Sequence, residues 1–227
     1  MRGFVVCLIV LGPVLASPAA FSADGNLQSV LARMDKAAAE FKSMTSQVTY
    51  LQHTQVLGED DSEAGTVTMK LVQPGEVQGR VDFTSPDPKI ITFEKRRVQE
   101  FLPKIKTLQV FDLAKHGEQL DNFLRTGFGT SGSELAKVYE VTLLGTENGT
   151  VHLQLIPKSA DMRQYVQKLD LWIPEQGDPY PLREKISEPS GDYRLVTYTG
   201  LKINPPMQPD ALQLKLPPGV KTEYPGK

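Results

Sequence analysis

Cysteine is almost absent from this sequence of 227 residues, since Cys7 is the only one. Cys7 lies inside an apolar N-terminal stretch that we expect to be removed. The mature chain is therefore predicted to have no disulfide, no thiol nucleophile and no thiolate metal site. A bacterial lipidation site carries its cysteine at the end of such a stretch, so we do not interpret Cys7 as a lipid attachment site.

An excess of basic residues is also absent, because 27 Asp and Glu residues balance 25 Lys and Arg residues. The short basic cluster at 95–97 is more typical of a solvated turn than of a docking surface. Nucleic-acid binding is excluded, because no basic run or patch is available to neutralise phosphates. Apolar residues make up 40% of the chain, which is enough for a folded domain with a substantial core.

Catalytic and metal-binding motifs are lacking as well. The three histidines, His53, His116 and His152, do not stand at metal-ligand spacing to one another or to paired acids. No G-x-S-x-G motif occurs, so the nucleophile elbow of an α/β-hydrolase is excluded. We expect no catalytic residue, no metal and no cofactor, and we interpret His152 as a surface position. A Ser-His-acid site assembled from distant segments stays open.

One glycine-rich stretch formally matches a dinucleotide-binding motif, since residues 127–132 read G-x-G-x-x-G. In a dinucleotide fold this motif follows a strand and opens a long helix within a βαβ unit. Here it follows a segment with helical spacing, in a chain that otherwise reads as antiparallel strands. We interpret it as a helix-to-helix connection with a serine cap. A sharper hypothesis is a hinge or lid beside a pocket, with Phe123 and Phe128 as its apolar contacts.

The N-terminus has the order of a secretory signal peptide: one cation, then an apolar stretch to Ala16, then small residues. A helix needs about 20 apolar residues to span a bilayer, so this stretch is too short for a comfortable anchor. We predict that residues 1–23 are removed, with cleavage between about Ala19 and Ala23. Residues 24–227 would then form a soluble domain in the periplasm.

A helix is predicted at the start of the mature chain. Apolar side chains recur there at spacings of four, three, four and three, which places them in one stripe. They are Leu27, Leu31, Met34, Ala38 and Phe41. Strands are predicted next, over 46–57, 65–72, 76–83, 89–94, 97–101 and 105–112.

The middle of the chain changes character. Leu120, Phe123 and Leu124 have helical spacing, and a glycine-rich break follows them. A second short helix is predicted to begin at Ser131 or Ser133, since serine is a favourable N-cap. We therefore expect two short helices to be inserted midway.

Strands are expected to resume after these helices. Asn148 and Gly149 predict a hairpin, because both residues tolerate a positive φ. The expected strands are 139–145, 150–156, 166–173, 182–188, 193–203 and 211–216, followed by an extended tail. No repeat and no linker divides the chain, so a single domain is predicted.

Apolar side chains are more numerous than one sheet face needs. In LDLWIP, Leu169, Leu171 and Ile173 share one face while Trp172 lies on the other. The strand over 193–203 likewise has apolar and polar side chains on both faces. An exported sheet with helices over one face can enclose an apolar cavity, although the same residues can equally fill a core.

Five segments carry a family resemblance through their order and spacing behind a signal sequence. They are MDKAAAEFKSMTSQVTYLQ, GTVTMKLVQPGEVQGRVDF, VQEFLPKIKTLQVFDL, LDLWIPEQGDPYPLREKISEPSGDYRLVTYTGLKINPP and LQLKLPPGV. Together they resemble the LolA-type periplasmic carriers of outer-membrane lipoproteins, over nearly all of the mature chain. Two features differ from the well-studied carriers. Lys70 is followed by Leu71 instead of an arginine, and only Phe101 and Pro103 echo a more aromatic stretch.

The resemblance implies a mainly β fold with a few helices: a curved antiparallel sheet that forms an incomplete barrel, its concave side covered by helices. It also implies a carrier that shelters the acyl chains of a lipoprotein, or another lipid, and moves it from the inner to the outer membrane. The implied partners are the acylated cargo, an inner-membrane exporter and, as a further expectation, an outer-membrane acceptor. The carrier itself is expected to be a monomer without nucleotide or metal.

The candidates for the cavity lining are apolar residues expected near the interface of helices and sheet. They are Leu31, Met34, Phe41, Phe101, Phe111, Phe123, Phe128, Trp172, Val196 and Tyr198. A one-residue slip in strand register exchanges the two faces, so the sequence leaves open which of them line it. Two other functions stay open: a lipid-sensing or partner-binding module of the same fold that does not shuttle cargo, and an exported hydrolase with a dispersed site.

Overall fold

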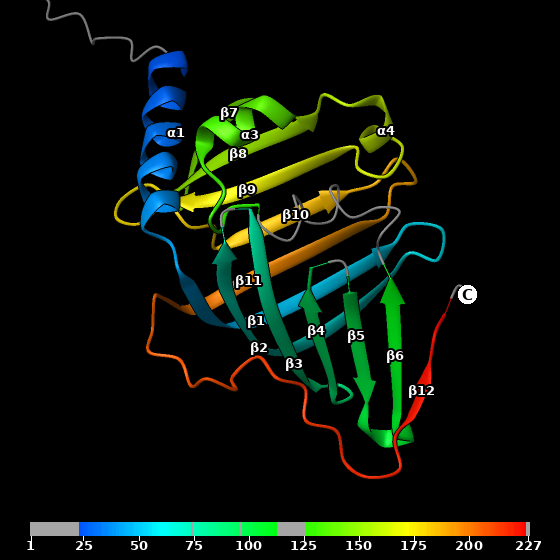
Figure 1. The fold of residues 1–227 in the computed structure, drawn as a ribbon. Coiled ribbons are helices and arrows are strands. Elements are labelled where there is room, and N and C mark those ends of the chain that lie inside the picture. Colours follow the sequence, from blue (N-terminus) through cyan, green and yellow to red (C-terminus); the bar gives the residue numbers. More distant parts are fainter. Residues whose placement is uncertain (1–22, 74, 96, 113–125, 226–227) are drawn as a thin grey trace, which may run out of the picture.

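The computed structural model describes residues 23–225 apart from 74, 96 and 113–125 (Figure 1). Most of the predicted signal peptide and the candidate Phe123 lie outside the described residues. The strands are β1 (Ser43–Thr54), β2 (Glu59–Gln73), β3 (Glu76–Ser85), β4 (Lys89–Glu94), β5 (Arg97–Leu102), β6 (Thr107–Asp112), β7 (Tyr139–Glu147), β8 (Thr150–Pro157), β9 (Lys168–Pro174), β10 (Arg183–Ser187), β11 (Tyr193–Ile203) and β12 (Lys221–Glu223).

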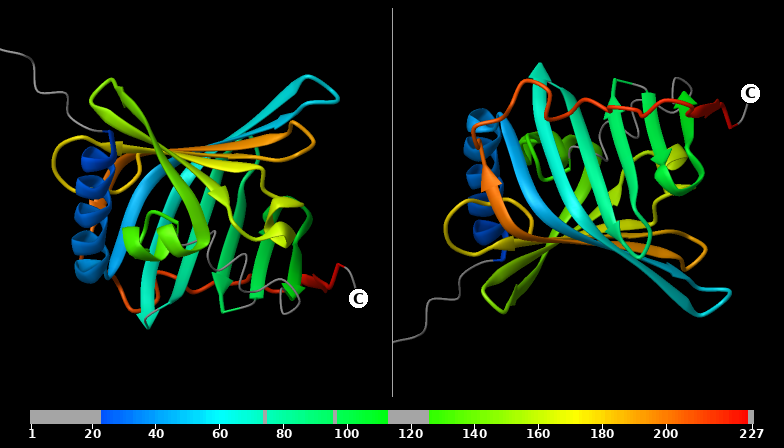
Figure 2. Two further views of the ribbon diagram at one scale, coloured as in Figure 1. Left: turned by 90° about the horizontal axis from the view of Figure 1, so that it is seen from above. Right: turned by 90° about the horizontal axis from the view of Figure 1, so that it is seen from below.

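These twelve strands form one sheet in the order β12-β6-β5-β4-β3-β2-β1-β11-β10-β9-β8-β7. Neighbours are antiparallel except for β12, which pairs with β6 in parallel. The sheet curls strongly and stays open, because its two end strands, β12 and β7, do not pair with each other (Figures 1 and 2). The predicted fold class, an incomplete and mainly antiparallel barrel, is confirmed.

The described helices are α1 (Ala23–Glu40), α3 (Gly132–Val138) and α4 (Ala160–Arg163), with a 3₁₀ turn, η1, over Pro103–Ile105. Figure 2 shows α3 within the curl of the sheet and α1 beside it. No described helix has the length and apolar character required to cross a membrane.

Residues at the start of α3 explain its position. The Ser131 hydroxyl accepts a hydrogen bond from the Glu134 N–H, and the Glu134 carboxylate accepts one from the Ser131 N–H. This capping box satisfies two backbone donors at the helix N-terminus, where the sequence predicted the start. A Cβ at Gly132 would stand 2.5 Å from the Leu31 carbonyl oxygen, so glycine allows α3 to approach the backbone of α1 closely.

Asn204, directly after β11, fastens the end of α1 to the sheet. Its Oδ1 accepts hydrogen bonds from the N–H groups of Lys42 at 2.7 Å and Ser43 at 3.0 Å. Its Nδ2 donates to the Glu40 carbonyl at 2.9 Å. One side chain thus satisfies a carbonyl that the end of the helix leaves unpaired and two backbone N–H groups where the chain enters β1.

The inward-facing side chains form two hydrophobic clusters. The first lies between the helices and strands β7–β10 and comprises Val30, Leu31, Met34, Leu135, Tyr139, Val151, Leu153, Leu155, Met162, Leu169, Leu171, Ile173 and Ile186. The second lies mainly over β1–β4 and comprises Phe41, Met44, Val48, Val67, Met69, Val77, Phe83, Phe93, Phe128 and Tyr180. Among the described residues, ten partly buried apolar side chains border the second cluster, against five for the first, so these residues leave the inner face more exposed around the second cluster.

Two local predictions had opposite outcomes. The hairpin at Asn148 and Gly149 is confirmed, with φ angles of 50° and 75° and with Glu147 opposite Thr150. The strand expected over 211–216 is wrong, because these residues form turns and extended chain, and β12 forms only later. This segment crosses the outer face of the sheet instead of following an edge, so no strand lies beside it to pair with (Figure 2).

Candidate functional site

The candidate functional site is the inner face of β1–β6 and β11. Strand register carries apolar residues across this face through the pairs Tyr198–Val48, Val196–Tyr50, Val67–Val81, Val81–Ile91, Phe93–Val98 and Val98–Phe111. Its partly buried members include Tyr50, Val81, Ile91, Val98, Val196 and Tyr198. We call this surface the inner apolar face.

An aromatic group closes one end of the inner apolar face. The Phe128 ring stacks on Tyr180 with 6.0 Å between centroids, and it meets Tyr198 edge-on at 5.1 Å. Phe41 packs against Phe128 and Tyr180, at 6.3 and 5.9 Å. The Tyr180 hydroxyl donates to the Ala37 carbonyl at 3.0 Å, which ties this group to α1. Burial, together with nearby carboxylates, raises the pKa of Tyr180 to about 12.

A carboxyl group is buried beside these rings. Glu184 of β10 is only 6% exposed and faces the inner side of the sheet, opposite Val196. The Tyr198 hydroxyl lies 3.5 Å from its Oε2, whereas its Oε1 has no hydrogen-bond partner among the described residues. Burial raises the pKa of Glu184 to about 8, so the carboxyl is protonated at neutral pH. Burial, and then the neighbouring Glu184, also raise the pKa of Tyr198.

The other end of the inner apolar face is charged. Lys89 Nζ lies 2.8 Å from Glu63 Oε1 and 3.7 Å from Glu100 Oε1. The same ammonium lies 5.0 Å from the centroid of the Phe83 ring. The face therefore changes from apolar to charged along its length, which suits an amphipathic ligand.

The described histidines lie on the outer face and pair with carboxylates. His152 Nε2 lies 2.9 Å from Asp170 Oδ1 while its ring stacks on Trp172, and His53 Nδ1 lies 2.7 Å from Asp60 Oδ1. Neither ring is hydrogen-bonded to a serine in the part of the chain that the structure describes. Within the same residues, no group of three His, Cys, Asp or Glu side chains is placed to hold a metal ion. The hydrolase alternative therefore gains no support from the described residues.

Comparisons with known proteins concern the fold. No family model matches the sequence, and no curated protein matches it. The chain is similar to the structure of an uncharacterised conserved protein from Thermus thermophilus, with a TM-score of 0.52 and 14% identity over 87% of this chain and 98% of the other. It is also similar to MucB, with a TM-score of 0.50, 18% identity and 86% of this chain covered, and it spans 64% of the MucB chain.

A LolA superfamily protein from Nitrosomonas europaea is also among the similar structures, with a TM-score of 0.41 and 15% identity over 83% of this chain and 97% of the other. The curled open sheet with helices on its inner side is the architecture that the sequence resemblance implies. The chain has a LolA-like fold. At these identities the similarity concerns the fold alone.

The LolA-like fold brings several candidate residues together. Phe128 contacts both Phe41 and Tyr198 in the aromatic group, and Val196 borders the same cluster. Phe111 lies further along the inner apolar face, on β6 opposite Val98. Leu31 and Met34 of α1 are buried in the first cluster, on the side of the helix that faces the sheet.

Two candidates lie on the outer face of the LolA-like sheet. Trp172 alternates with the inward-facing Leu171 and Ile173, and it stacks on His152 on the side away from the helices. Phe101 of β5 lies opposite Ile90. The next residue, Ile91, faces inward, so Ile90 and Phe101 face outward. The structure therefore separates these two side chains from the other candidates.

Sequence reasoning missed Glu184 and Tyr180. Glu184 stands between Arg183 and Lys185, so its local pattern predicts a solvated strand position. Tyr180 lies within a loop rich in turn residues, DPYP, which carries no periodic signal. A weak signal existed for Glu184. Ile186, two residues further along the strand, lies on the same face and is buried, so an apolar residue at 186 indicates that position 184 also faces inward.

Proposed function

We propose that the chain is an exported carrier that shelters the acyl chains of a lipoprotein, or of another lipid, on the inner apolar face. The observation that carries this proposal is a curved face of apolar side chains that the described residues leave partly exposed. Transfer of each CH₂ group from water to apolar surroundings is favourable by about 0.8 kcal/mol, so an acyl chain leaves a membrane only for such a shelter. The LolA-like fold supports this reading.

The proposal assigns roles to the two ends of the inner apolar face. Acyl chains would pack against Val81, Ile91, Val98 and Val196. Phe128 and its aromatic neighbours would close the end away from the charged group. The charged group around Lys89 would stay with the polar part of the cargo. Phe111 would extend the lining across β6.

The proposal also includes export and delivery. Its support is the signal-like leader at residues 1–23 and the resemblance of the remaining chain to periplasmic carriers. The cargo would be received from an inner-membrane exporter and delivered to the outer membrane. A lipid-sensing or partner-binding module of the same fold is the alternative, and it would keep its lipid instead of transferring it.

Native mass spectrometry of residues 24–227, purified from a bacterial periplasm, tests whether a lipid is bound. We expect a one-to-one complex with an acylated lipoprotein or a phospholipid, which denaturation then releases for identification. A ligand-free mass, together with no uptake of added phospholipid or acylated peptide, would contradict the proposal and favour the partner-binding alternative.

Two neighbouring isoleucines offer a matched pair of variants. Ile91 faces the inner apolar face, whereas Ile90 has the opposite parity and lies on the outer face. Ile91→Asn is expected to weaken binding of a fluorescent fatty acid about tenfold, because a polar amide then faces the acyl chain. Ile90→Asn makes the same chemical change in the adjacent residue and is expected to leave the affinity unchanged. Equal losses in the two variants would show that the inner apolar face is not the binding surface.

A further inference from the structure

A cleft of about 780 Å³ lies on the outer face of the sheet, on the side away from the inner apolar face. Its floor comes from β3–β6 and its roof from the C-terminal segment 205–220, which we call the strap. The floor presents Gln78, Thr92, Gln99 and Val110, and the roof presents Leu212, Leu214 and Leu216. Figure 2 shows the strap crossing the outside of the sheet toward β12.

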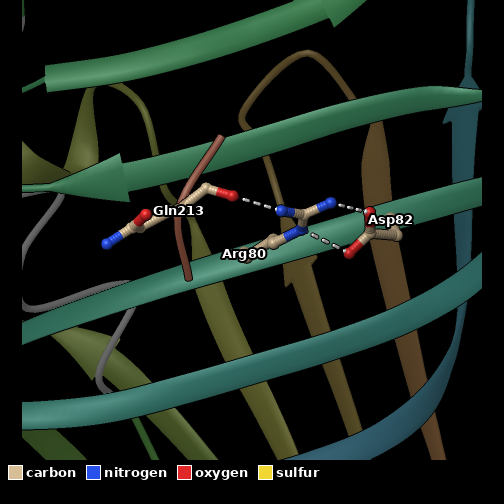
Figure 3. A network of polar contacts seen from close by, with 3 residues as sticks. All are labelled: Arg80, Asp82 and Gln213. Atoms are coloured by element: carbon tan, nitrogen blue, oxygen red, sulfur yellow. Dashed lines mark hydrogen bonds and ion pairs between the residues drawn. The ribbon is translucent and has the colours of Figure 1, made fainter. Parts of the chain in front are cut away.

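The strap is anchored on both sides of this cleft. Arg80 of β3 donates to the Gln213 carbonyl through Nη1, while its Nε and Nη2 donate to Asp82 at 2.8 and 2.7 Å (Figure 3). Asp82 thus fixes the guanidinium that holds the strap, and this contact raises the pKa of Arg80. At the other side, the Lys221 N–H donates to the Lys106 carbonyl at 2.9 Å and β12 pairs with β6.

The floor carries hydrogen-bonding groups that the described residues do not use. The side chains of Gln78, Thr92 and Gln99 have no hydrogen-bond partner within the described part of the chain. They stand on three adjacent strands, with Thr92 directly opposite Gln99. Thr92 is buried, at 8% exposure. The polar atoms of these side chains still reach water, and a ligand that displaces this water has to donate and accept hydrogen bonds in its place, because a polar group left unpaired on binding is costly.

The lining also disfavours two ligand classes, acyl chains and nucleic acid. An acyl chain would leave the floor amides unpaired, since it has no hydrogen-bonding groups. Nucleic acid requires an excess of cations, whereas the charged residues of the cleft, Lys95 and Arg97 against Glu94 and Asp112, balance. An extended peptide fits, because its side chains alternate between two faces, and one face can be polar while the other is apolar.

We propose that this outer cleft binds a short, uncharged, extended segment of a partner protein. Its polar side chains would face Gln78, Thr92 and Gln99, and its apolar side chains would face Leu214 and Leu216 of the strap. Crossing from β3 to β6 covers three strand spacings, about 14 Å, which corresponds to roughly four extended residues. The proposal does not depend on the lipid-carrier function, because the two sites lie on opposite faces of the sheet.

Nuclear magnetic resonance of the nitrogen-15-labelled mature chain provides the test. The probes are two blocked pentapeptides with alternating polarity, Thr-Leu-Thr-Leu-Thr and Gln-Val-Gln-Val-Gln, each added up to about 1 mM, the weak limit of specific recognition. At least one probe is expected to shift the side-chain amide signals of Gln78 and Gln99 and the backbone signals of 212–216. The signals of Val81 and Ile91 on the inner apolar face are expected to stay in place.

Variants separate specific recognition from surface adsorption. The double variant Gln78→Ala/Gln99→Ala removes two partly exposed amides that belong to neither hydrophobic cluster, and it is expected to weaken peptide binding about tenfold. Gln47→Ala removes an exposed glutamine from the outer face of β1, away from the cleft, and serves as the matched control. Arg80→Gln releases the strap and is expected to abolish the shifts in 212–216, while fatty-acid binding persists.

Three results would overturn the proposal. One is the absence of shifts with both peptides, and another is equal affinity of the double variant and the Gln47→Ala control. The third is a shift of the Gln78 and Gln99 amides by a trimer of N-acetylglucosamine but by neither peptide, which would assign the cleft to sugars. Loss of lipid binding in the Ile91→Asn variant has no bearing on these readouts, so the two proposals can fail separately.

Discussion

Tyr198 and Glu184 meet diagonally across strands β11 and β10, with 3.5 Å between the tyrosine hydroxyl and Glu184 Oε2. This is a long hydrogen bond, and Oε1 of the same carboxyl has no partner among the described residues. Water is also largely excluded, since Glu184 is 6% exposed. The carboxyl is therefore poorly compensated as an anion, and it remains protonated at pH values where an ordinary glutamate is charged.

The stability of the fold is expected to depend on pH through Glu184. Burial raises its pKa to about 8 in the folded chain, from 4.5 for the ordinary side chain. The folded state thus keeps a proton that the unfolded state releases between these values. The stabilising contribution of this proton is complete below the unfolded pKa and is lost as the pH rises through the folded pKa. We expect the free energy of unfolding in urea to fall over this range, by at most about 1.4 kcal/mol per pH unit from this group.

Glu184→Gln tests the assignment, because an amide of similar shape cannot titrate. The variant is expected to lose most of this pH dependence and to be more stable than the parent chain above pH 8. Glu175→Gln, at an exposed position after β9, is the control and should keep the pH dependence of the parent. If Glu184→Gln retained the full slope, another group would be responsible.

Phe128 is expected to be the most sensitive position of the aromatic group. Its side chain is 1% exposed and contacts the rings of Phe41, Tyr180 and Tyr198. Phe128→Ala should lower the free energy of unfolding by about 3–5 kcal/mol, since it removes apolar contacts and leaves a cavity. Phe128→Leu should cost less because it refills part of that space. Urea denaturation measures both, and a loss below about 1 kcal/mol for alanine would mean that the group repacks freely.

Asn204 is expected to contribute through its side chain and not through its backbone conformation. Asn204→Gly keeps a positive φ accessible but removes the three hydrogen bonds to Glu40, Lys42 and Ser43. A destabilisation of about 2–3 kcal/mol is expected, and amide hydrogen exchange should accelerate at Lys42 and Ser43. Unchanged exchange at these two amides would contradict the fastening role of Asn204.

Elements with local signals could be predicted from the sequence. The stripe from Leu27 to Phe41 predicts α1, Ser131 predicts the start of α3, and Asn148 with Gly149 predicts a hairpin. Each of these features depends on residues within one or two turns of chain, where spacing and capping chemistry decide the conformation. Most of the strands could be predicted from similarly local signals, namely runs of β-branched, aromatic and aliphatic residues bounded by turn residues.

The site depends on relationships that no local pattern contains. Val196 and Tyr198 line the inner face because β11 pairs with β1 in one particular register, and a slip by one residue would turn them outward. Glu184 is buried close to Tyr198 and Gly127, which its own local sequence does not reveal. The strap failed as a predicted strand for a similar reason: Leu212 and Leu214 alternate, but their partner is the face of a sheet and not a neighbouring strand.

Gly79 and Phe93 provide the final prediction, on the packing of the inner apolar face itself. A Cβ at Gly79 would stand 2.0 Å from the tip of the Phe93 ring, which lies over β3 at this glycine. Gly79→Ala is therefore expected to displace the ring and to cost about 1–3 kcal/mol of stability. Fatty-acid binding should weaken too, because the displaced ring enters the space proposed for acyl chains.

A double-mutant cycle isolates this contact. Phe93→Leu removes the ring tip that the new methyl group would meet, so Gly79→Ala should cost less in that background than alone. A coupling energy between about 0.5 and 3 kcal/mol is expected from urea denaturation of the four proteins. Strictly additive costs would show that the ring and the glycine do not constrain each other. Lipid affinity is expected to recover in the double variant if the displaced Phe93 ring is what blocks the acyl chain. Coupling in stability together with this recovery would show that one steric contact, between the new methyl group and the ring, causes both effects.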